Sequence, residues 1–204
     1  MKQLVEKLIS TGYLKTPEII NALYKINRAD FLPENLKSES QVNAPLPIGY
    51  GQTISQPLTV AFMLELLQPK SGHKILDVGS GSGWQSLLLA YITSDKGRVI
   101  AIERISELSE FGKENSRKYN FKNLKFIVGN GSKGYKEEAP YDRIIVAAAA
   151  FDKIPKELKN QLKIGGRLVI PVKNSIWLVV KKKENKFEEK EFPGFVFVPL
   201  VEDV

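Results

Sequence analysis

Between residues 74 and 172, five short apolar runs alternate with segments of helical pattern, and this alternation constrains the fold more than any other feature of the chain. The runs read KILDV, RVIAIE, LKFIV, YDRIIVAAA and GGRLVIPV. Strands that are apolar along most of their length are typical of parallel sheets with helices on both faces. The sequence therefore predicts an α/β protein with a doubly wound, mostly parallel sheet.

The segments on either side of this core differ from it. Two short amphipathic helices are expected first, from residue 2 to about 10 and from Pro17, with Thr16 as the N-cap of the second. Residues 31–56 contain several prolines and glycines and are expected to be irregular. We interpret the chain as one domain of three parts: a helical cap with an active-site loop (1–56), a cofactor-binding α/β core (57–172) and a C-terminal extension of antiparallel strands (173–204).

The composition excludes several kinds of site. The 204 residues include no cysteine and one histidine, His73, so disulfides, cysteine or histidine metal sites and a Ser-His-Asp triad are not expected. No apolar run approaches the ~18 residues of a membrane span, and Glu6 and Lys7 interrupt the apolar N-terminus, unlike in a signal peptide. We therefore expect a cytoplasmic protein without a metal or a membrane partner, either a monomer or a weak homo-oligomer.

The net charge of +7 raises the question of nucleic-acid binding. The densest basic run, KKKENK at residues 181–186, is followed at once by FEEKE, and Glu184-Asn185 is typical of a hairpin tip. The other lysines are scattered without interleaved aromatic residues. No nucleic-acid partner is expected from this pattern.

A glycine-rich turn follows the first apolar run. Open parallel sheets bind ligands beyond the carboxyl ends of their strands, and here Asp77 precedes a turn that contains Gly79, Ser80 and Gly81. The dinucleotide pattern G-x-G-x-x-G is not met, because Trp84 stands in the last glycine position. The turn is therefore either a ligand-binding loop without a seat for a pyrophosphate, or simply a tight connection into the next helix.

Two further polar groups follow the next runs. Glu103 ends RVIAIE, where an acidic side chain would accept hydrogen bonds from both hydroxyls of a ribose. Asn130-Gly131 follows the third run, where the asparagine could bond to an adenine edge and the glycine would leave room for the ring. A site for a nucleoside that lacks a phosphate-binding loop suits S-adenosylmethionine better than NAD or ATP. The sulfonium and carboxylate ends of the cofactor would then lie over the glycine loop near Asp77.

The segment PIGYGQTISQP, residues 47–57, places hydroxyls and amides just before a predicted helix that starts at Pro57. It can present the Thr53 and Ser55 hydroxyls over a methyl donor. The segment LPIGYGQTISQP resembles the hallmark loop of the protein-L-isoaspartate O-methyltransferases. The resemblance continues, in order and at the family's spacing, through LDVGSGSGWQSLLLA, VIAIERI, GNGSKGY, YDRIIVAAAA, IPKELKNQLKIGGRLVIPV and FVPLV.

The resemblance implies a Rossmann-like methyltransferase fold and one reaction. The reaction is methyl transfer from S-adenosylmethionine to the free α-carboxylate of L-isoaspartyl residues in damaged proteins, whose ester then forms a succinimide. The implied catalytic residues are Ser55 and Thr53. The implied cofactor residues are Gly79, Ser80 and Gly81 on the methionine side, Glu103 and Arg104 at the ribose, and Asn130 and Gly131 at the adenine.

The chain departs from the family's pattern at two positions. Asn130 stands where the family usually has aspartate, and Ala147 where threonine or glycine is common. A neutral acceptor forms a weaker hydrogen bond than a carboxylate, so cofactor affinity could be lower. Two alternative functions stay open at this point: an RNA methyltransferase of the same fold, which the basic charge would suit, and a non-catalytic relative that binds S-adenosylmethionine.

Overall fold

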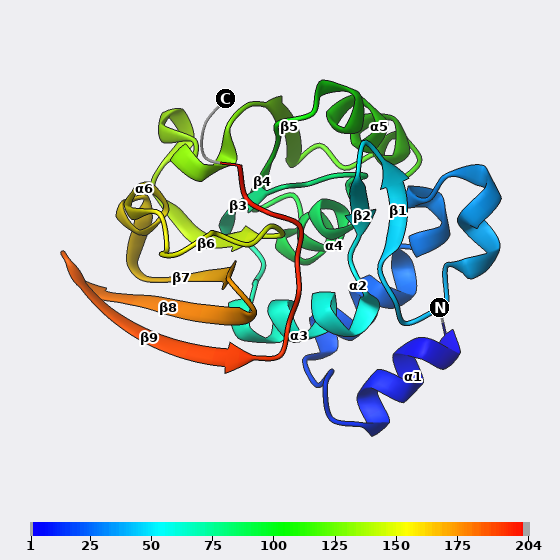
Figure 1. Cartoon of the computed structure of the whole chain (residues 1–204), viewed down its shortest axis with the longest axis horizontal. Coiled ribbons are helices and arrows are strands. Elements are labelled where there is room, and N and C mark those ends of the chain that lie inside the picture. The colour runs from blue at the N-terminus through cyan, green and yellow to red at the C-terminus, as the bar shows by residue number, and fades with distance from the viewer. Residues whose placement is uncertain (1, 202–204) are drawn as a thin grey trace.

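The computed structural model describes residues 2–201, which form a seven-stranded sheet with helices on both faces (Figure 1). Position 1 and positions 202–204 of the predicted domain lie outside the described residues. The strand order is β5-β4-β3-β6-β7-β8-β9. The five parallel strands are β3 (Lys74–Val78), β4 (Arg98–Glu103), β5 (Leu124–Val128), β6 (Tyr141–Val146) and β7 (Leu162–Val172). The antiparallel strands β8 (Ser175–Lys183) and β9 (Lys186–Pro193) extend the sheet, so the predicted doubly wound fold is confirmed.

Alternate side chains of the core strands pack into two separate clusters, one on each face of the sheet. Ile75 of β3 joins a cluster that contains residues of α1 (Lys2–Ser10), α2 (Pro17–Lys25), α3 (Pro57–Leu67), α4 (Trp84–Thr93) and α5 (Ser106–Arg117). Its neighbour Leu76 joins the opposite cluster, which contains Leu158 of α6 (Lys156–Asn160). Burial on both faces explains why these strands are apolar along most of their length. No helix in residues 2–201 is both long and apolar enough to cross a membrane.

The segment before α3 is more ordered than the sequence predicts. It contains two 3-10 helices, η1 (Arg28–Phe31) and η2 (Glu34–Glu39), and two antiparallel strands, β1 (Leu46–Gly49) and β2 (Gln52–Ile54). The strands are joined through Tyr50 and Gly51, which both have positive φ, as a tight hairpin turn requires. The prediction of an irregular segment is therefore wrong for the hairpin. Strands this short, with a proline inside one of them, give little periodic signal.

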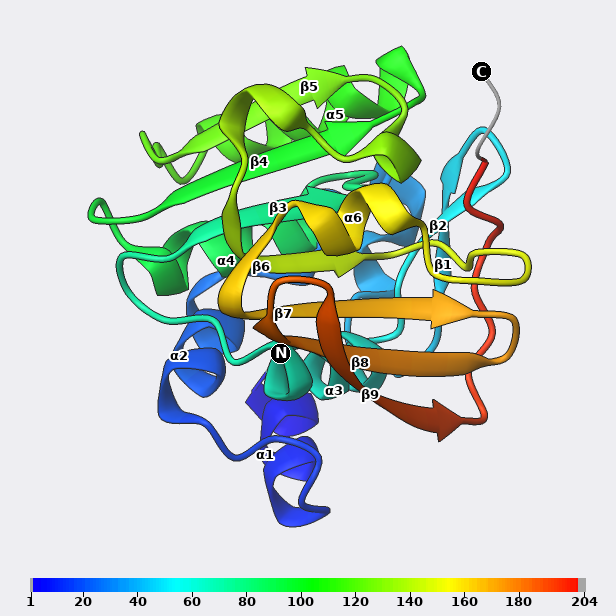
Figure 2. The same cartoon turned by 90° about the vertical axis from the view of Figure 1, so that its left-hand side faces the viewer.

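The two N-terminal helices and the β1–β2 hairpin occupy different places. In the predicted first part, residues 1–56, the helices form the cap and the hairpin belongs to the active-site loop. In the structure α1 and α2 pack their apolar stripes into the cluster on one face of the sheet, which also contains Leu46, Ile48 and Ile54 of the hairpin. Figure 2 shows the hairpin at the carboxyl ends of the parallel strands, beside the C-terminal segment. That segment is held there by backbone hydrogen bonds of Ala149 with Val198 (2.8 Å) and Leu200 (2.7 Å).

A carboxylate on α3 holds the connection between α1 and α2. The Glu65 side chain accepts hydrogen bonds from the backbone N–H groups of Lys15 and Thr16 and from the Thr16 hydroxyl, each at 2.7 Å. Thr16 stands at the predicted N-cap position of α2, but its side chain does not cap the helix and bonds to Glu65 instead. Glu65 therefore anchors the start of α2 to the core.

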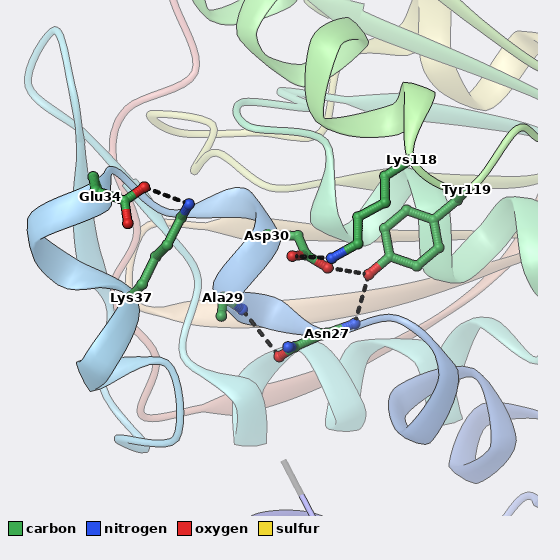
Figure 3. Close-up of polar contacts among 7 residues, drawn as sticks. All are labelled: Asn27, Ala29, Asp30, Glu34, Lys37, Lys118 and Tyr119. Carbon is green, nitrogen blue, oxygen red and sulfur yellow. Dashed lines mark hydrogen bonds and ion pairs between the residues drawn. The ribbon is translucent and has the colours of Figure 1, made fainter.

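We expect Glu65→Ala to lower the free energy of unfolding by about 2 kcal/mol, the typical cost of losing hydrogen bonds to a charged group. Urea unfolding measures the change. The control is Glu34→Ala, which removes the exposed Glu34–Lys37 ion pair drawn in Figure 3 and should cost less than about 1 kcal/mol. Equal effects of the two substitutions would contradict the anchoring role of Glu65.

Candidate active site

One pocket lies at the carboxyl edge of the sheet, where the strand order reverses between β3 and β6. This is the place where open α/β sheets bind ligands. The space measures about 830 Å³, including the part that opens to solvent. Its walls come from the ends of three neighbouring strands, the turn after β5, the β1–β2 hairpin and the C-terminal segment. Of the predicted site residues, the pocket brings together Thr53, Ser55, Gly79, Ser80, Gly81, Glu103, Arg104 and Gly131.

Glu103 is fixed in this pocket by backbone donors on both sides. Its Oε2 atom accepts a hydrogen bond from the Gly81 N–H and its Oε1 atom accepts one from the Ile105 N–H, each at 3.0 Å. The residue is 7% exposed, and each carboxylate oxygen keeps capacity for a further donor. Glu103 can therefore accept hydrogen bonds from vicinal hydroxyls without having to reorient.

The glycine loop presents an unused hydrogen-bonding group to the same space. Gly79, Gly81 and Gly83 all have positive φ, which lets the chain turn sharply from β3 into α4. Between them, the Ser80 hydroxyl is buried and has no partner among the described residues. Buried polar groups are nearly always bonded, so this orphan hydroxyl fits a pocket that holds a polar ligand.

Asp77 lies behind the loop and does not line the pocket. Its carboxylate accepts hydrogen bonds from Gln85 (2.7 Å) and Ser86 (2.6 Å) in the first turn of α4. Burial raises the pKa of Asp77 to about 6, although the two hydrogen bonds oppose the shift. The sequence predicts Asp77 beside the ligand, whereas in the structure its contacts tie the start of α4 to the end of β3.

Asn130 and Gly131 have different roles in the turn after β5. The Asn130 Oδ1 atom accepts hydrogen bonds from the Ser132 N–H (3.0 Å) and hydroxyl (2.7 Å), which caps a short 3-10 helix. The Asn130 oxygen, which the sequence predicts to accept a hydrogen bond from the adenine, thus accepts hydrogen bonds within its own turn. Gly131 lines the pocket, and a Cβ atom there would lie 2.3 Å from Cγ1 of Val78. Only glycine lets this turn lie so close to the sheet.

Thr53 and Ser55 border a second hollow as well as the main pocket. This hollow, of about 740 Å³ including open space, is also lined by residues of the C-terminal segment. Ser55 does not cap α3, because the Asn43 Oδ1 atom accepts the hydrogen bond from the Leu58 N–H at 3.0 Å. Ser55 is therefore not used at the helix end, and the residue borders both spaces.

Several residues of the pocket were not predicted as site residues. They include Ile48 and Gln52 of the hairpin, Trp84 and Gln85 at the start of α4, Ala147 and Ala148 after β6, and the segment Val198 to Val201. The resemblance to the family extends through FVPLV and could have indicated a role for the last segment, but nothing in its composition places it at this edge. No cluster of acidic or histidine side chains in residues 2–201 could hold a metal ion.

The fold and the pocket are of the Rossmann-like kind, and the proteins that this chain is similar to place it in the class of S-adenosylmethionine-dependent methyltransferases. The family model described as protein-L-isoaspartate(D-aspartate) O-methyltransferase matches residues 1–204. The chain belongs to this family, which confirms the resemblance seen in the sequence.

Similar proteins agree with this assignment. The chain is 45% identical to the protein-L-isoaspartate O-methyltransferase of Methanopyrus kandleri, over 98% of this chain and 90% of that protein. It is 44% identical to the enzyme of the same name from Pyrococcus abyssi, over 98% of this chain and 94% of that one. A crystal structure of such a protein from Plasmodium falciparum, in complex with S-adenosyl-L-homocysteine, superposes with a TM-score of 0.87 at 26% identity and covers 99% of this chain and 98% of that one.

The raised pKa of Asp77 gives the first prediction for the site. Its ordinary pKa is 3.8 and its folded value is about 6, so the folded protein binds more protons than the unfolded chain between those values. The contribution of Asp77 to stability therefore falls as the pH rises through this window. The measurement is the difference between the unfolding free energies of wild type and Asp77→Asn. As the pH rises from about 4 to 7, this difference (wild type minus variant) should fall by something on the order of 3 kcal/mol. A constant difference in urea unfolding across this range would contradict it.

The packing of Gly131 gives the second prediction. In Gly131→Ala the new Cβ must displace the buried Val78 side chain, and we expect S-adenosylhomocysteine to bind about tenfold more weakly or worse. Gly129→Ala is the matched control in the same turn, since the nearest atom to its Cβ would be Cδ1 of Ile102 at 3.4 Å, an ordinary contact distance. Isothermal titration calorimetry measures both. Wild-type affinity in Gly131→Ala would show that the turn does not border the ligand.

Proposed function

We propose that this chain transfers a methyl group from S-adenosylmethionine to the free α-carboxylate of L-isoaspartyl residues in proteins, with Ser55 and Thr53 at the acceptor. The observation that carries the proposal is that these two side chains share one pocket with Glu103, Ser80 and Gly131. The proposal also rests on membership of the family and on relatives that carry the name of this activity.

The cofactor would occupy the wall formed by the sheet. Glu103, held by two backbone donors, would accept hydrogen bonds from the ribose hydroxyls, with Arg104 at its side. The orphan Ser80 hydroxyl and the glycine loop would contact the methionine part, and Gly131 would give room for the adenine. S-adenosylmethionine, when bound, supplies an electrophilic methyl group on a sulfonium. Asp77 and Asn130 would support this wall through their hydrogen bonds to Gln85, Ser86 and Ser132.

The acceptor needs orientation rather than activation. A main-chain carboxyl has a pKa of roughly 3.3–3.7, so it is already ionised at neutral pH and no general base is required. Thr53 and Ser55 can bind the carboxylate through their hydroxyls, and neutral donors leave it more nucleophilic than a paired arginine would. What remains for the protein is to align the carboxylate and to exclude water from it.

The partner would be a flexible segment of a damaged protein. The second hollow beside Thr53 and Ser55 is lined by Pro45, Gln56, Thr59, Ala147 and residues Val196, Phe197 and Val198, and it opens to solvent. Such a hollow can receive the chain on either side of an isoaspartyl residue. The cytoplasmic location and the monomeric or weakly associating state remain predictions from the sequence.

The test is transfer of labelled methyl from S-adenosylmethionine to an isoaspartyl peptide, with the matched aspartyl peptide as substrate control. We expect base-labile incorporation into the isoaspartyl peptide alone. Ser55→Ala should lower kcat/KM about ten- to a hundredfold, which corresponds to the loss of one hydrogen bond to a charged group. Ser116→Ala, at a half-buried position on α5 where the hydroxyl donates to the Lys113 carbonyl, is the matched control and should behave as wild type.

Two results would overturn the proposal. Absence of incorporation by a wild-type protein that binds S-adenosylhomocysteine would exclude the reaction. Equal rates for Ser55→Ala and wild type would remove Ser55 from the acceptor site.

A further inference from the structure

A fully buried arginine lies against the segment that carries Thr53 and Ser55. Arg28 begins η1, directly after α2, and is 0% exposed. Arginine is almost never fully buried unless its charge and its hydrogen-bond donors are matched by partners. Both terminal nitrogens of Arg28 have partners, whereas its Nε has none among the described residues. The partners of the terminal nitrogens therefore indicate its role.

The guanidinium of Arg28 binds both ends of the β1–β2 hairpin. It donates hydrogen bonds of 2.8 to 3.5 Å to backbone carbonyls of the segment before β1 and of the segment where β2 ends. The accepting carbonyls belong to Ser40, Val42 and Ala44 before the hairpin and to Ile54 and Ser55 after it. A planar guanidinium fork can join two chain segments in this way, whereas a lysine ammonium has fewer donors and no fixed plane.

The charge of Arg28 is matched by dipoles and by an aromatic ring. Burial lowers the pKa of Arg28 to about 10, which leaves it protonated at neutral pH. The guanidinium carbon lies 5.5 Å from the ring centroid of Trp84, within reach of a cation–π interaction. Trp84 in turn borders the main pocket. The guanidinium thus touches the hairpin on one side and the pocket wall on the other.

The carbonyls that Arg28 binds belong to the chain around the acceptor site. The Ser55 carbonyl is 3.1 Å from Nη2 of Arg28, and the Ser55 side chain lines the pocket. Asn43, which caps α3, lies between two residues whose carbonyls Arg28 also binds. A shift of either hairpin end would therefore move the Ser55 hydroxyl relative to the sheet.

The backbone on both sides of Arg28 is itself anchored to the core. Figure 3 shows the contacts of Asn27 and Asp30 with residues just after α5. The Asp30 carboxylate binds Lys118 at 2.6 Å and accepts a hydrogen bond from the Tyr119 hydroxyl. That hydroxyl accepts a hydrogen bond of 3.0 Å from the Asn27 N–H. The backbone that carries Arg28 is therefore anchored to the core, so Arg28 can hold the hairpin in a defined position.

We propose that Arg28 is a positioning residue, which fixes the β1–β2 hairpin and with it the Ser55 and Thr53 hydroxyls over the methyl donor. The inference rests on the proposed function, because it takes these hydroxyls to be the contacts of the acceptor carboxylate. Arg28 acts through backbone carbonyls and does not touch the substrate. Its loss should impair use of the peptide far more than binding of the cofactor.

The experiment compares wild type with Arg28→Lys, which keeps the charge, and Arg28→Met, which keeps the approximate length without it. We expect kcat/KM for the isoaspartyl peptide to fall about ten- to a hundredfold in both, since a small misplacement of a contact group can have an effect of that size. The dissociation constant of S-adenosylhomocysteine should change less than about threefold, because Glu103, Ser80 and Gly131 lie on the sheet side.

Hydrogen exchange supplies a readout that does not depend on activity. Amides in residues 40–56 should exchange faster in the Arg28 variants, while those in residues 74–103 should keep the protection of the wild type. Asn123→Ala is the matched control, because it removes buried hydrogen bonds to Ala90, Thr93 and Ser94 at the end of α4 but leaves Arg28 and its support untouched. It should lower stability without a selective loss of kcat/KM for the peptide.

Each outcome decides the inference. Unchanged kcat/KM in a folded Arg28→Lys protein, equal losses for peptide and cofactor, or faster exchange throughout the chain would overturn it. If both Arg28 variants fail to fold, Arg28 is a residue of the core and the proposal is wrong. If wild type itself transfers no methyl group, the proposed function fails, while the exchange pattern still reports whether Arg28 fixes the hairpin.

Discussion

The parallel run of β5, β4, β3 and β6 is the constraint on which the rest of the site depends. Parallel strands end on the same side of a sheet, so the turns that follow them meet at one edge. The register places Val78 of β3 beside Ile102 of β4 and Val146 of β6. The next residues along each strand are then close enough for the Glu103 carboxylate to bind the Gly81 N–H. One half of the pocket thus follows from strand direction and register alone.

The other half of the pocket comes from segments far apart in the sequence. The β1–β2 hairpin precedes the core strands, and residues 198–201 follow the last strand, yet both border the same space. Each is held by backbone hydrogen bonds, the hairpin through Arg28 and the C-terminal segment through Ala149. Neutral hydroxyls on the hairpin suit an acceptor that is already ionised and needs only to be aligned. The covering half therefore supplies the acceptor side of the chemistry, and the sheet supplies the cofactor side.

The sequence predicts the sheet-borne half well, for physical reasons. Buried parallel strands need continuous apolar runs, and a sharp turn from strand to helix needs glycine, so both leave local signals. The polar residue that ends a strand, such as Glu103, can then be placed at the correct edge. The polar segment before α3 indicated Thr53 and Ser55, and the resemblance to a known family gave their roles and added Arg104. The pocket brings these three residues together with Glu103.

What the sequence does not predict depends on contacts between distant residues. The hairpin strands are too short for a periodic pattern, and the burial of Arg28 cannot be inferred from a charged residue in a polar segment. Asp77 and Asn130 stand at the expected positions, but their side chains bond to the neighbouring residues Gln85, Ser86 and Ser132 rather than line the pocket. Whether a polar side chain at a strand end faces the ligand or its own turn is decided by local hydrogen bonds that spacing does not reveal.

One pocket joins the cofactor wall on the sheet to the Thr53 and Ser55 hydroxyls on the hairpin segment. A crystal structure with S-adenosylhomocysteine and an isoaspartyl peptide tests it most directly. We expect the ribose hydroxyls on Glu103 and the peptide's free α-carboxylate within hydrogen-bond distance of the Ser55 or Thr53 hydroxyl. A carboxylate bound elsewhere, with the hydroxyls of Ser55 and Thr53 facing solvent, would show that the hairpin segment does not bind the acceptor.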